Sequence, residues 1–503
     1  VLVNRDGVYF PGLSTADIQL EISASLENKV ISYEIGIPWK MITPVKPFIN
    51  SSWGINLIYV DRDQEEREAL LLYPDLNYDT EMTQKRKGAL FTFINHSPQE
   101  PESQSQFNGS HFYSDQDKVL TVAVNSPDEA SGWNIKYALS SAQKDFTEEE
   151  PVSLKKGMNM MRYALPKDNY PTGLYDLSLA IIDDKGALRF AGTHTFFVIN
   201  KADFESLTRS IDEIKQGKQY AEDQRFQNSF PTLEIRLQWI QEFAQNAHLY
   251  ADIRDLKEWN EEVELLFKNV QKGEPALFPA GSLGRLAHRS KLDNTLQPYS
   301  VLVPGDYDGK KPFLLFVTLH GSGVDERQFV FSVARSFPMA MGRRNIPSMF
   351  ILAPKARELS SWYLGDSGKD VLECIEHIKT LYNIDSKRII LDGFSMGGYG
   401  AWRLSLLYPD LFRAAIIRSG ALAPPQSLGG ENILDLMKPG IKTSYLVIHG
   451  DKDNAVTVEN ARQAVQKLKQ LGIPHRYIEV KGGAHGDYER WDAIFSWLKE
   501  ILS

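Results

Sequence analysis

One serine stands in a sequence pattern that favours nucleophilic chemistry. Ser395 is the centre of the pentapeptide Gly393–Gly397, which follows the apolar run Arg388–Phe394 and precedes the helix-like stretch GYGAWRLSLL. A turn this tight between a strand and a helix leaves no room for side chains at its two glycines, and it projects the serine hydroxyl above the sheet. The pattern therefore predicts that Ser395 is a nucleophile.

A serine hydroxyl needs a base, and the base needs an orienting acid. Asp453 and His485 each follow an apolar strand-like run, and they come 58 and then 32 residues further along the chain. Each interval leaves room for a strand and its helices, and the order Ser, Asp, His is one that this strand–turn–helix context uses. We predict that Ser395, Asp453 and His485 form a catalytic triad. Asp451 is the alternative acid, but in the loop pattern H-G-x-x-D-x-x-V the later aspartate faces the histidine.

Attack on a carbonyl also requires hydrogen-bond donors for the developing oxyanion. One expected donor is the backbone N–H of Met396, the residue after the nucleophile. The other is expected from the loop His320–Gly323, with Ser322 N–H as the first choice and its neighbouring glycines as alternatives. His320 and His449 each precede a glycine directly after a strand, and we interpret both as residues that shape loops.

Strands and helices alternate from about residue 285, as in a parallel sheet covered on both faces. The run Phe313–Leu319 is apolar throughout, which suits a strand buried on both sides. After Ser367-x-x-Asp370, which is typical of a helix start, apolar residues recur at helical spacing from Val371 to Leu381. Further strands are expected at Met349–Pro354, Arg388–Phe394, Ala414–Gly420, Tyr445–Gly450 and His475–Val480. Residues 285–503 are predicted to form a doubly wound, mostly parallel sheet.

The remaining sequence predicts a multidomain protein. Residues 1–98 are expected to form a β-sandwich, because apolar and polar residues alternate, for example from Ile31 to Ile37. After a polar linker, short strands in 111–200 are typical of an immunoglobulin-like sandwich. In 201–280 the apolar spacing changes to three and four, which predicts a helical connector with solvated charged faces.

Four segments carry a family resemblance, namely Leu319–Gly323 (LHGSG), Asp385–Phe412, His449–Val456 (HGDKDNAV) and Gly482–Asp487 (GGAHGD). They resemble the feruloyl-esterase and polyhydroxybutyrate-depolymerase-like group of α/β-hydrolases, and also the catalytic domain of the prolyl oligopeptidase family. The resemblance covers residues 285–503. It implies a serine carboxylic-ester hydrolase that forms an acyl-enzyme on Ser395.

Two features favour esters attached to a polymer. The interval between the strands at Ala414 and Tyr445 is too short for a large helical lid, so the site is expected to be open. The segment Tyr33–Trp39 (YEIGIPW), with Trp53–Asp63, resembles the second half of a family 9 carbohydrate-binding module, which implies either sugar binding or a structural module. The expected substrates are short-chain or aromatic esters, including acetyl or feruloyl groups linked to polysaccharide.

Two other classes of protein fit the sequence less well. A serine peptidase of the prolyl oligopeptidase type would carry a β-propeller, but residues 1–275 show no repeat of propeller length. A scaffold with an inactive hydrolase fold is disfavoured because every triad position is filled.

Three residues are candidates for substrate contact. Trp362 and Tyr363 either stack on a sugar or aromatic acyl group or pack internally, and Arg418 binds an acidic substrate group or forms an ion pair.

Composition limits the partners. The net charge of −9, without a basic stretch, argues against nucleic acid. No apolar run is long enough to span a membrane. Val1, without a methionine or apolar leader, is expected to begin a processed or shortened chain, and a secreted or periplasmic location is expected.

No cofactor and no metal site is predicted from the sequence. Asp61 and Asp63 lack the glycine-bearing ligand loop of a calcium site. The single cysteine, Cys374, lies in an apolar helical pattern and is expected to be inert core.

Overall fold

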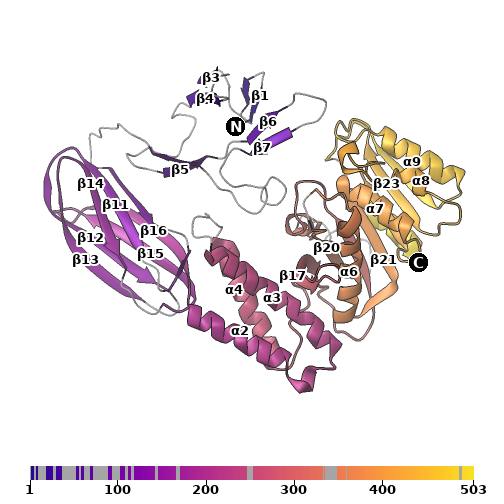
Figure 1. The fold of residues 1–503 in the computed structure, drawn as a ribbon, viewed down its shortest axis with the longest axis horizontal. Coiled ribbons are helices and arrows are strands. Elements are labelled where there is room, and N and C mark those ends of the chain that lie inside the picture. Colours follow the sequence, from indigo (N-terminus) through magenta and orange to yellow (C-terminus); the bar gives the residue numbers. More distant parts are fainter. Residues whose placement is uncertain are drawn as a thin grey trace. The chain divides into compact units, whose positions relative to one another are not determined.

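The computed structural model of the 503-residue chain describes its C-terminal part most fully (Figure 1). The described residues are eight short strands between residues 2 and 92, and then 102–107, 111–114, 118–141, 145–165, 170–245, 253–331, 333–334, 348–357, 360–486 and 490–502. The chain divides into two compact units, one of Val1–Glu205 with Glu242–Lys257, and the other of Ser206–Gln241 with Glu258–Ser503.

The eight short strands of the first unit form antiparallel pairs. Strand β3 pairs with β4, β5 with β8, β6 with β7, and β1 with β2. Their bounds are Leu2–Asn4 (β1), Gly7–Tyr9 (β2), Gln19–Ser25 (β3), Val30–Gly36 (β4), Ser52–Ile55 (β5), Ile58–Asp61 (β6), Glu68–Leu71 (β7) and Ala89–Thr92 (β8). Ile37, Pro38 and Trp39 of the carbohydrate-binding-like segment lie outside the described residues, as does Asp63.

Two sheets follow in residues 102–199. One has the strand order β10-β16-β15-β12-β13 and the other the order β14-β11-β9. Buried residues of both sheets, such as Val122 of β11 and Ile135 of β12, belong to one hydrophobic core. The immunoglobulin-like assignment stays a prediction. The strand bounds are Glu102–Phe107 (β9), His111–Tyr113 (β10), Val119–Ser126 (β11), Ala130–Ser140 (β12), Phe146–Leu154 (β13), Gly157–Ala164 (β14), Gly173–Ile182 (β15) and Leu188–Ile199 (β16).

Three helices occupy most of the predicted connector: α2 (Lys201–Lys215), α3 (Gln224–Gln245) and α4 (Ile253–Gln271). From Ser206 to Gln241 and from Glu258 onward they belong to the same compact unit as the large sheet. The helical pattern predicted from the sequence is present, and its apolar residues Leu233, Leu237 and Ile240 are buried.

One charge on α3 is buried rather than solvated. The Arg236 side chain is fully buried, and its Nε lies 2.7 Å from the Glu262 carboxylate. It also donates to the carbonyl of Thr232 at 2.6 Å and to the carbonyl of Arg285 on the sheet. Since a buried guanidinium requires such partners, this arginine joins the helices to the sheet. The expectation that the charged faces are solvated is therefore wrong at Arg236.

The C-terminal sheet has eight strands in the order β17-β18-β20-β19-β21-β22-β23-β24. Strands β17 and β18 are antiparallel to their neighbours, and the others run parallel. The predicted mostly parallel sheet is thus confirmed. The strand bounds are Leu283–Arg289 (β17), Leu296–Leu302 (β18), Phe313–Leu319 (β19), Met349–Pro354 (β20), Ile384–Phe394 (β21), Ala414–Arg418 (β22), Ser444–Gly450 (β23) and His475–Val480 (β24).

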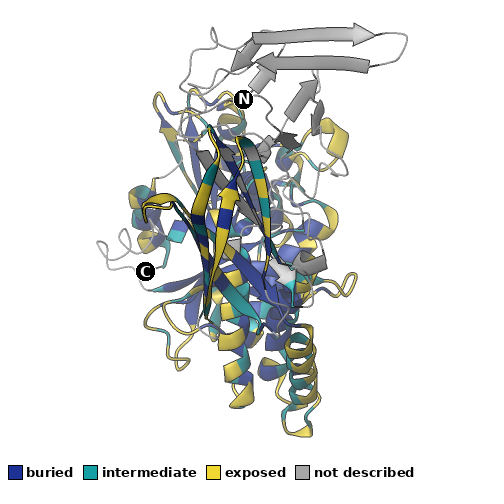
Figure 2. Ribbon diagram, turned by 90° about the vertical axis from the view of Figure 1, so that its left-hand side faces the viewer, coloured by how far each residue is buried: buried dark blue, intermediate teal, exposed yellow. Residues whose placement is uncertain are grey.

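Helices cover both faces of this sheet. Alternate residues of a strand point to opposite faces. Tyr445 of β23 stacks on Trp402 of α7, with ring centroids 4.9 Å apart, whereas the next residue, Leu446, shares a core with Phe495 of α10. Every residue of β19, β20 and β22 is buried, and Figure 2 colours the ribbon by the burial of each residue. The helices are α6 (Gly365–Leu381), α7 (Met396–Leu407), α8 (Ile433–Leu436), α9 (Glu459–Gln470) and α10 (Trp491–Leu502).

Among the described residues, no helix combines the length and apolar character that crossing a membrane requires.

Candidate active site

Ser395 occupies a strained turn between β21 and α7. Its φ of 57° and ψ of −117° lie outside the regions that L-residues normally adopt. A Cβ at Gly393 would lie 2.0 Å from the carbonyl oxygen of Gly397, and a Cβ at Gly397 would lie 2.1 Å from that of Leu319. The two glycines are therefore required by backbone contacts, as the sequence pattern indicates. The Ser395 N–H donates to the carbonyl of Arg418 at 2.9 Å, which ties the turn to the neighbouring strand.

The structure brings the three predicted triad residues into one hydrogen-bonded chain. His485 Nε2 lies 2.9 Å from Ser395 Oγ, and His485 Nδ1 lies 2.7 Å from Asp453 Oδ2. The Asp453 side chain is fully buried, whereas the imidazole of His485 remains 27% exposed. With Nδ1–H donated to the carboxylate, Nε2 is free to accept the serine proton. This is the geometry that a base-activated nucleophile needs.

Asp453 is held by its own loop. Its Oδ1 accepts hydrogen bonds from the backbone N–H groups of Ala455 at 2.9 Å and Val456 at 2.8 Å, so Oδ2 faces His485. The alternative acid, Asp451, instead accepts from the N–H of Gly482 at 2.6 Å. It thus closes the turn beside the histidine loop and takes no part in the hydrogen-bonded chain.

His449 makes a further contact with the acid that the sequence did not indicate. Its Nε2 lies 2.8 Å from the carbonyl of Val456 and 3.3 Å from Asp453 Oδ2. Burial lowers the pKa of His449, which keeps the ring neutral. A neutral ring that carries its proton on Nε2 donates to the Val456 carbonyl and lies against the Asp453 carboxylate without adding a charge. We therefore expect His449 to position Asp453, and its bond to Val456 agrees with the interpretation that it shapes the loop.

We expect His449→Leu to lower kcat for a small ester about fivefold with little change in KM, because about 1 kcal/mol of support for Asp453 is lost. His449→Gln, whose amide can still donate to Val456, should recover part of that loss. Steady-state kinetics with p-nitrophenyl acetate measures both variants, and His475→Gln is the matched control because His475 contacts the carbonyl of Ile473 instead. An unchanged kcat in His449→Leu would contradict a role of His449 in positioning Asp453.

The predicted oxyanion loop lies beside the nucleophile turn. Gly321 is close to Phe394, since a Cβ there would lie 3.2 Å from the phenyl ring. Ser322 is exposed, and its Oγ lies 2.6 Å from Ser360 Oγ. Met396 is buried and opens α7, so its N–H is one of the first-turn donors that lack an acceptor within the helix. The assignment of Met396 and Ser322 as oxyanion donors stays a proposal.

The three candidate substrate contacts differ in burial. Trp362 is half-buried, and its ring contacts that of Tyr399 edge to face at 5.7 Å. Tyr363 is fully buried and donates its O–H to the carbonyl of His320 at 3.0 Å, so it supports the loop from inside and cannot stack on a substrate. Arg418 is fully buried as well and lies beneath the turn. Only Trp362 therefore remains a candidate for substrate contact.

Arg418 forms an ion pair that fixes the strands under the nucleophile. Its Nε lies 2.8 Å from Asp392 Oδ1 and its Nη2 lies 2.5 Å from Oδ2, with both side chains fully buried. Thr318 donates to Asp392 Oδ2 at 2.6 Å, and the guanidinium lies over the ring of Trp491 at 5.1 Å. Of the two interpretations of Arg418, the structure thus contains the ion pair. Asp392, a charge that directly follows the apolar run Ile389–Leu391, was the available signal for this partner.

Sequence comparisons match the C-terminal part of the chain to esterases and a thioesterase. Residues 319–499 match the model of the Phospholipase/Carboxylesterase family. The chain is 23% identical over 198 residues to a probable feruloyl esterase C of Aspergillus niger, covering 39% of this chain and 69% of the relative. It is 30% identical over 142 residues to an acyl-protein thioesterase 1 homolog of Dictyostelium discoideum, covering 27% and 59%. A solved ferulic acid esterase of Anaeromyces mucronatus is 16% identical with a TM-score of 0.37, covering 45% of this chain and 93% of that one.

The C-terminal domain is α/β-hydrolase-like, with a mostly parallel eight-stranded sheet, and its residues 319–499 match a carboxylesterase family model. The protein is a carboxylic ester hydrolase, as the sequence predicted.

Proposed function

We propose that this enzyme hydrolyses esters through an acyl-enzyme on Ser395, with His485 as the base and Asp453 as the orienting acid. Ser395 Oγ attacks the ester carbonyl carbon while His485 Nε2 takes the hydroxyl proton. The tetrahedral intermediate then collapses, the carbon–oxygen bond to the alcohol breaks, and His485 returns the proton to the leaving alcohol. The observation that carries the proposal is the continuous hydrogen-bonded chain of Asp453, His485 and Ser395.

The second half of the reaction uses the same groups. His485 takes a proton from water, the resulting hydroxide attacks the acyl carbon, and the acid leaves as Ser395 regains its proton. Both tetrahedral intermediates carry a negative oxygen, for which the N–H groups of Met396 and Ser322 are the proposed donors. Each such donor contributes about 3 kcal/mol to lowering the barrier in comparable sites.

The proposed substrates are short-chain or aromatic esters, including acetyl or feruloyl groups on polysaccharide. Residues 419–443, between β22 and β23, contain only a three-residue 3₁₀ turn and the four-residue helix α8, so this interval provides no helical lid. An open site suits a bulky ester. The feruloyl esterase relative supports the aromatic acyl group, and half-buried Trp362 offers a ring surface for it.

The N-terminal region is proposed to hold the enzyme on its polymer. In this proposal residues 1–98 are a β-sandwich that binds sugar, residues 111–200 are an immunoglobulin-like module, residues 201–280 connect them, and residues 285–503 catalyse. Since polysaccharide esters lie outside the cytoplasm, the proposal includes a secreted or periplasmic enzyme.

A substrate panel tests the proposed specificity. We expect the kcat/KM for p-nitrophenyl esters to fall from acetate and butyrate to decanoate, and we expect turnover of methyl ferulate and release of ferulate or acetate from feruloylated or acetylated xylan. Matched thioesters and proline-containing peptides form the comparison arms. Preference for a long-chain thioester over every oxygen ester, or cleavage of the peptides at a higher kcat/KM, would reject this substrate class.

A further inference from the structure

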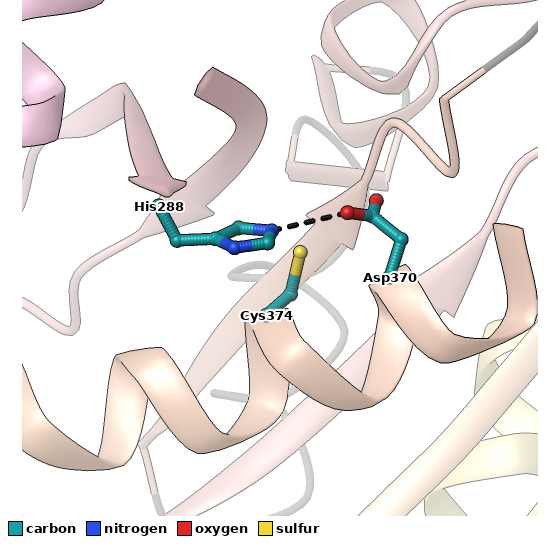
Figure 3. A group of neighbouring side chains, drawn as sticks. All are labelled: His288, Asp370 and Cys374. Carbon is teal, nitrogen blue, oxygen red and sulfur yellow. Dashed lines mark hydrogen bonds and ion pairs between the residues drawn. The ribbon is translucent and has the colours of Figure 1, made fainter. Parts of the chain in front are cut away.

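A second group of chemically capable side chains lies away from the triad, between β17 and α6. His288 of β17 and Asp370 and Cys374 of α6 point toward one another (Figure 3). His288 Nε2 lies 3.1 Å from Asp370 Oδ1, and one ligand atom from each of the three residues lies within 4.8 Å of the other two. All three are buried, His288 at 3% exposure and the other two at 0%.

The donor set is one that suits zinc. An imidazole nitrogen, a thiolate and a carboxylate oxygen are the three kinds of protein ligand that Zn²⁺ uses. Asp370 and Cys374 are four residues apart on one helix, so they lie on the same face and one turn from each other. His288 approaches from the strand opposite, which gives the group ligands from two separate elements.

The surroundings of the group fit a bound cation. Asp370 Oδ2 is buried and has no hydrogen-bond partner, which is costly for a carboxylate oxygen in the interior. The second ring nitrogen of His288, Nδ1, lies 3.8 Å from Glu373 Oε2. Histidines that bind metals usually direct their other N–H to a carboxylate, and Glu373 places a carboxylate on this side of the ring, beyond direct hydrogen-bond distance.

We propose that His288 Nε2, Asp370 and the Cys374 thiolate bind one zinc ion that links β17 to α6. Asp370 can bind through both carboxylate oxygens, including the unpartnered Oδ2. The site then offers four donor atoms, namely His288 Nε2, Cys374 Sγ and the two oxygens of Asp370. With a neutral imidazole, two anionic ligands balance the charge of the divalent ion, so the buried site is neutral overall. The role is structural, because the ligands leave no open position and lie apart from Ser395.

The proposal differs from the inert role that the sequence predicts for Cys374. Burial raises the pKa of this thiol, so in the absence of a cation it stays protonated. Zinc binding displaces that proton to solvent, and the thiolate becomes the ligand.

The test uses the full chain expressed in zinc-supplemented medium, because buried ligands take up the ion as the domain folds. Elemental mass spectrometry should find about one zinc per chain after gel filtration. Expression with cobalt in place of zinc should give the near-ultraviolet absorption of a thiolate bound to Co²⁺. Both measurements need only the wild-type protein, so they decide the question even if the variants fold poorly.

Variants locate the metal. Cys374→Val and Asp370→Asn should each lower the zinc content about tenfold or more and lower Tm by about 5 °C. His377→Gln is the matched control and should keep the metal, since both ring nitrogens of His377 are occupied, Nδ1 by the Tyr299 hydroxyl at 2.8 Å and Nε2 by the carbonyl of Asn228 at 2.8 Å. Wild-type protein with less than about 0.1 zinc per chain and no cobalt–thiolate band would overturn the proposal.

Discussion

Replacing Ser395 by alanine is expected to lower kcat for p-nitrophenyl acetate by at least about 10⁴-fold, with no comparable loss of stability. The reason is that no other hydroxyl is hydrogen-bonded to His485 Nε2 among the described residues. The remaining rate would come from the oxyanion donors and from substrate binding. Single-turnover and steady-state kinetics measure the loss, and urea unfolding checks the fold.

The triad residues should also behave as a unit. His485→Ala should lower kcat to a similar extent, and the double variant with Ser395→Ala should be no slower than either single variant, because each change already removes the same activated nucleophile. Asp453→Ala and Asp451→Ala form a matched pair on one loop. Asp453→Ala should lower kcat by orders of magnitude, and Asp451→Ala should lower it by less than about tenfold. Additive losses in the double variant, or equal effects of the two aspartates, would contradict the assigned roles.

The second large effect is expected on stability. Asp392→Asn should destabilise the catalytic domain by about 3–5 kcal/mol, because the buried guanidinium of Arg418 would lose the charge that balances it. The pair is fully buried, and its two contacts of 2.8 Å and 2.5 Å are bidentate. The midpoint of urea unfolding, followed by tryptophan fluorescence, measures the change.

Two further variants show whether the loss of any ion pair would lower stability to the same extent. Glu500→Gln breaks an ion pair with Arg476 in which both side chains are largely exposed, and it should cost less than about 1 kcal/mol. The double variant Asp392→Leu with Arg418→Met removes both charges and should recover much of the lost stability. If Asp392→Asn and Glu500→Gln lower the free energy of unfolding by the same amount, the buried ion pair contributes no more to stability than the exposed one, which would contradict this prediction.

The sequence predicted what depends on local pattern. Continuous apolar runs such as Phe313–Leu319 predicted buried strands, and the two glycines around Ser395 predicted the strained turn. Asp453 and His485 could be selected because parallel strands bring their C-terminal ends to one edge, where distant loops meet. Strands β17 and β18 were not foreseen as antiparallel additions, since pairing direction leaves little trace in a single strand.

What the sequence could not show is contact between distant segments. The pairing of Arg418 with Asp392 and the approach of His288 to Asp370 each join residues that are far apart in the chain. For Tyr363 and its neighbour Trp362 the sequence left both substrate stacking and internal packing open, but both have positive φ, 54° and 53°, and the bend directs Tyr363 into the core. Backbone conformations of this kind are rare for aromatic residues and have no clear sequence signal.

The most direct test of the proposed mechanism is labelling with a fluorophosphonate, followed by peptide mapping by mass spectrometry. Such probes phosphonylate an activated serine and mimic the first tetrahedral intermediate. We predict a single adduct on Ser395 that forms in proportion to the loss of esterase activity and is absent in His485→Ala. Complete inactivation with the adduct on any other residue, or full activity after Ser395 is labelled, would contradict the account.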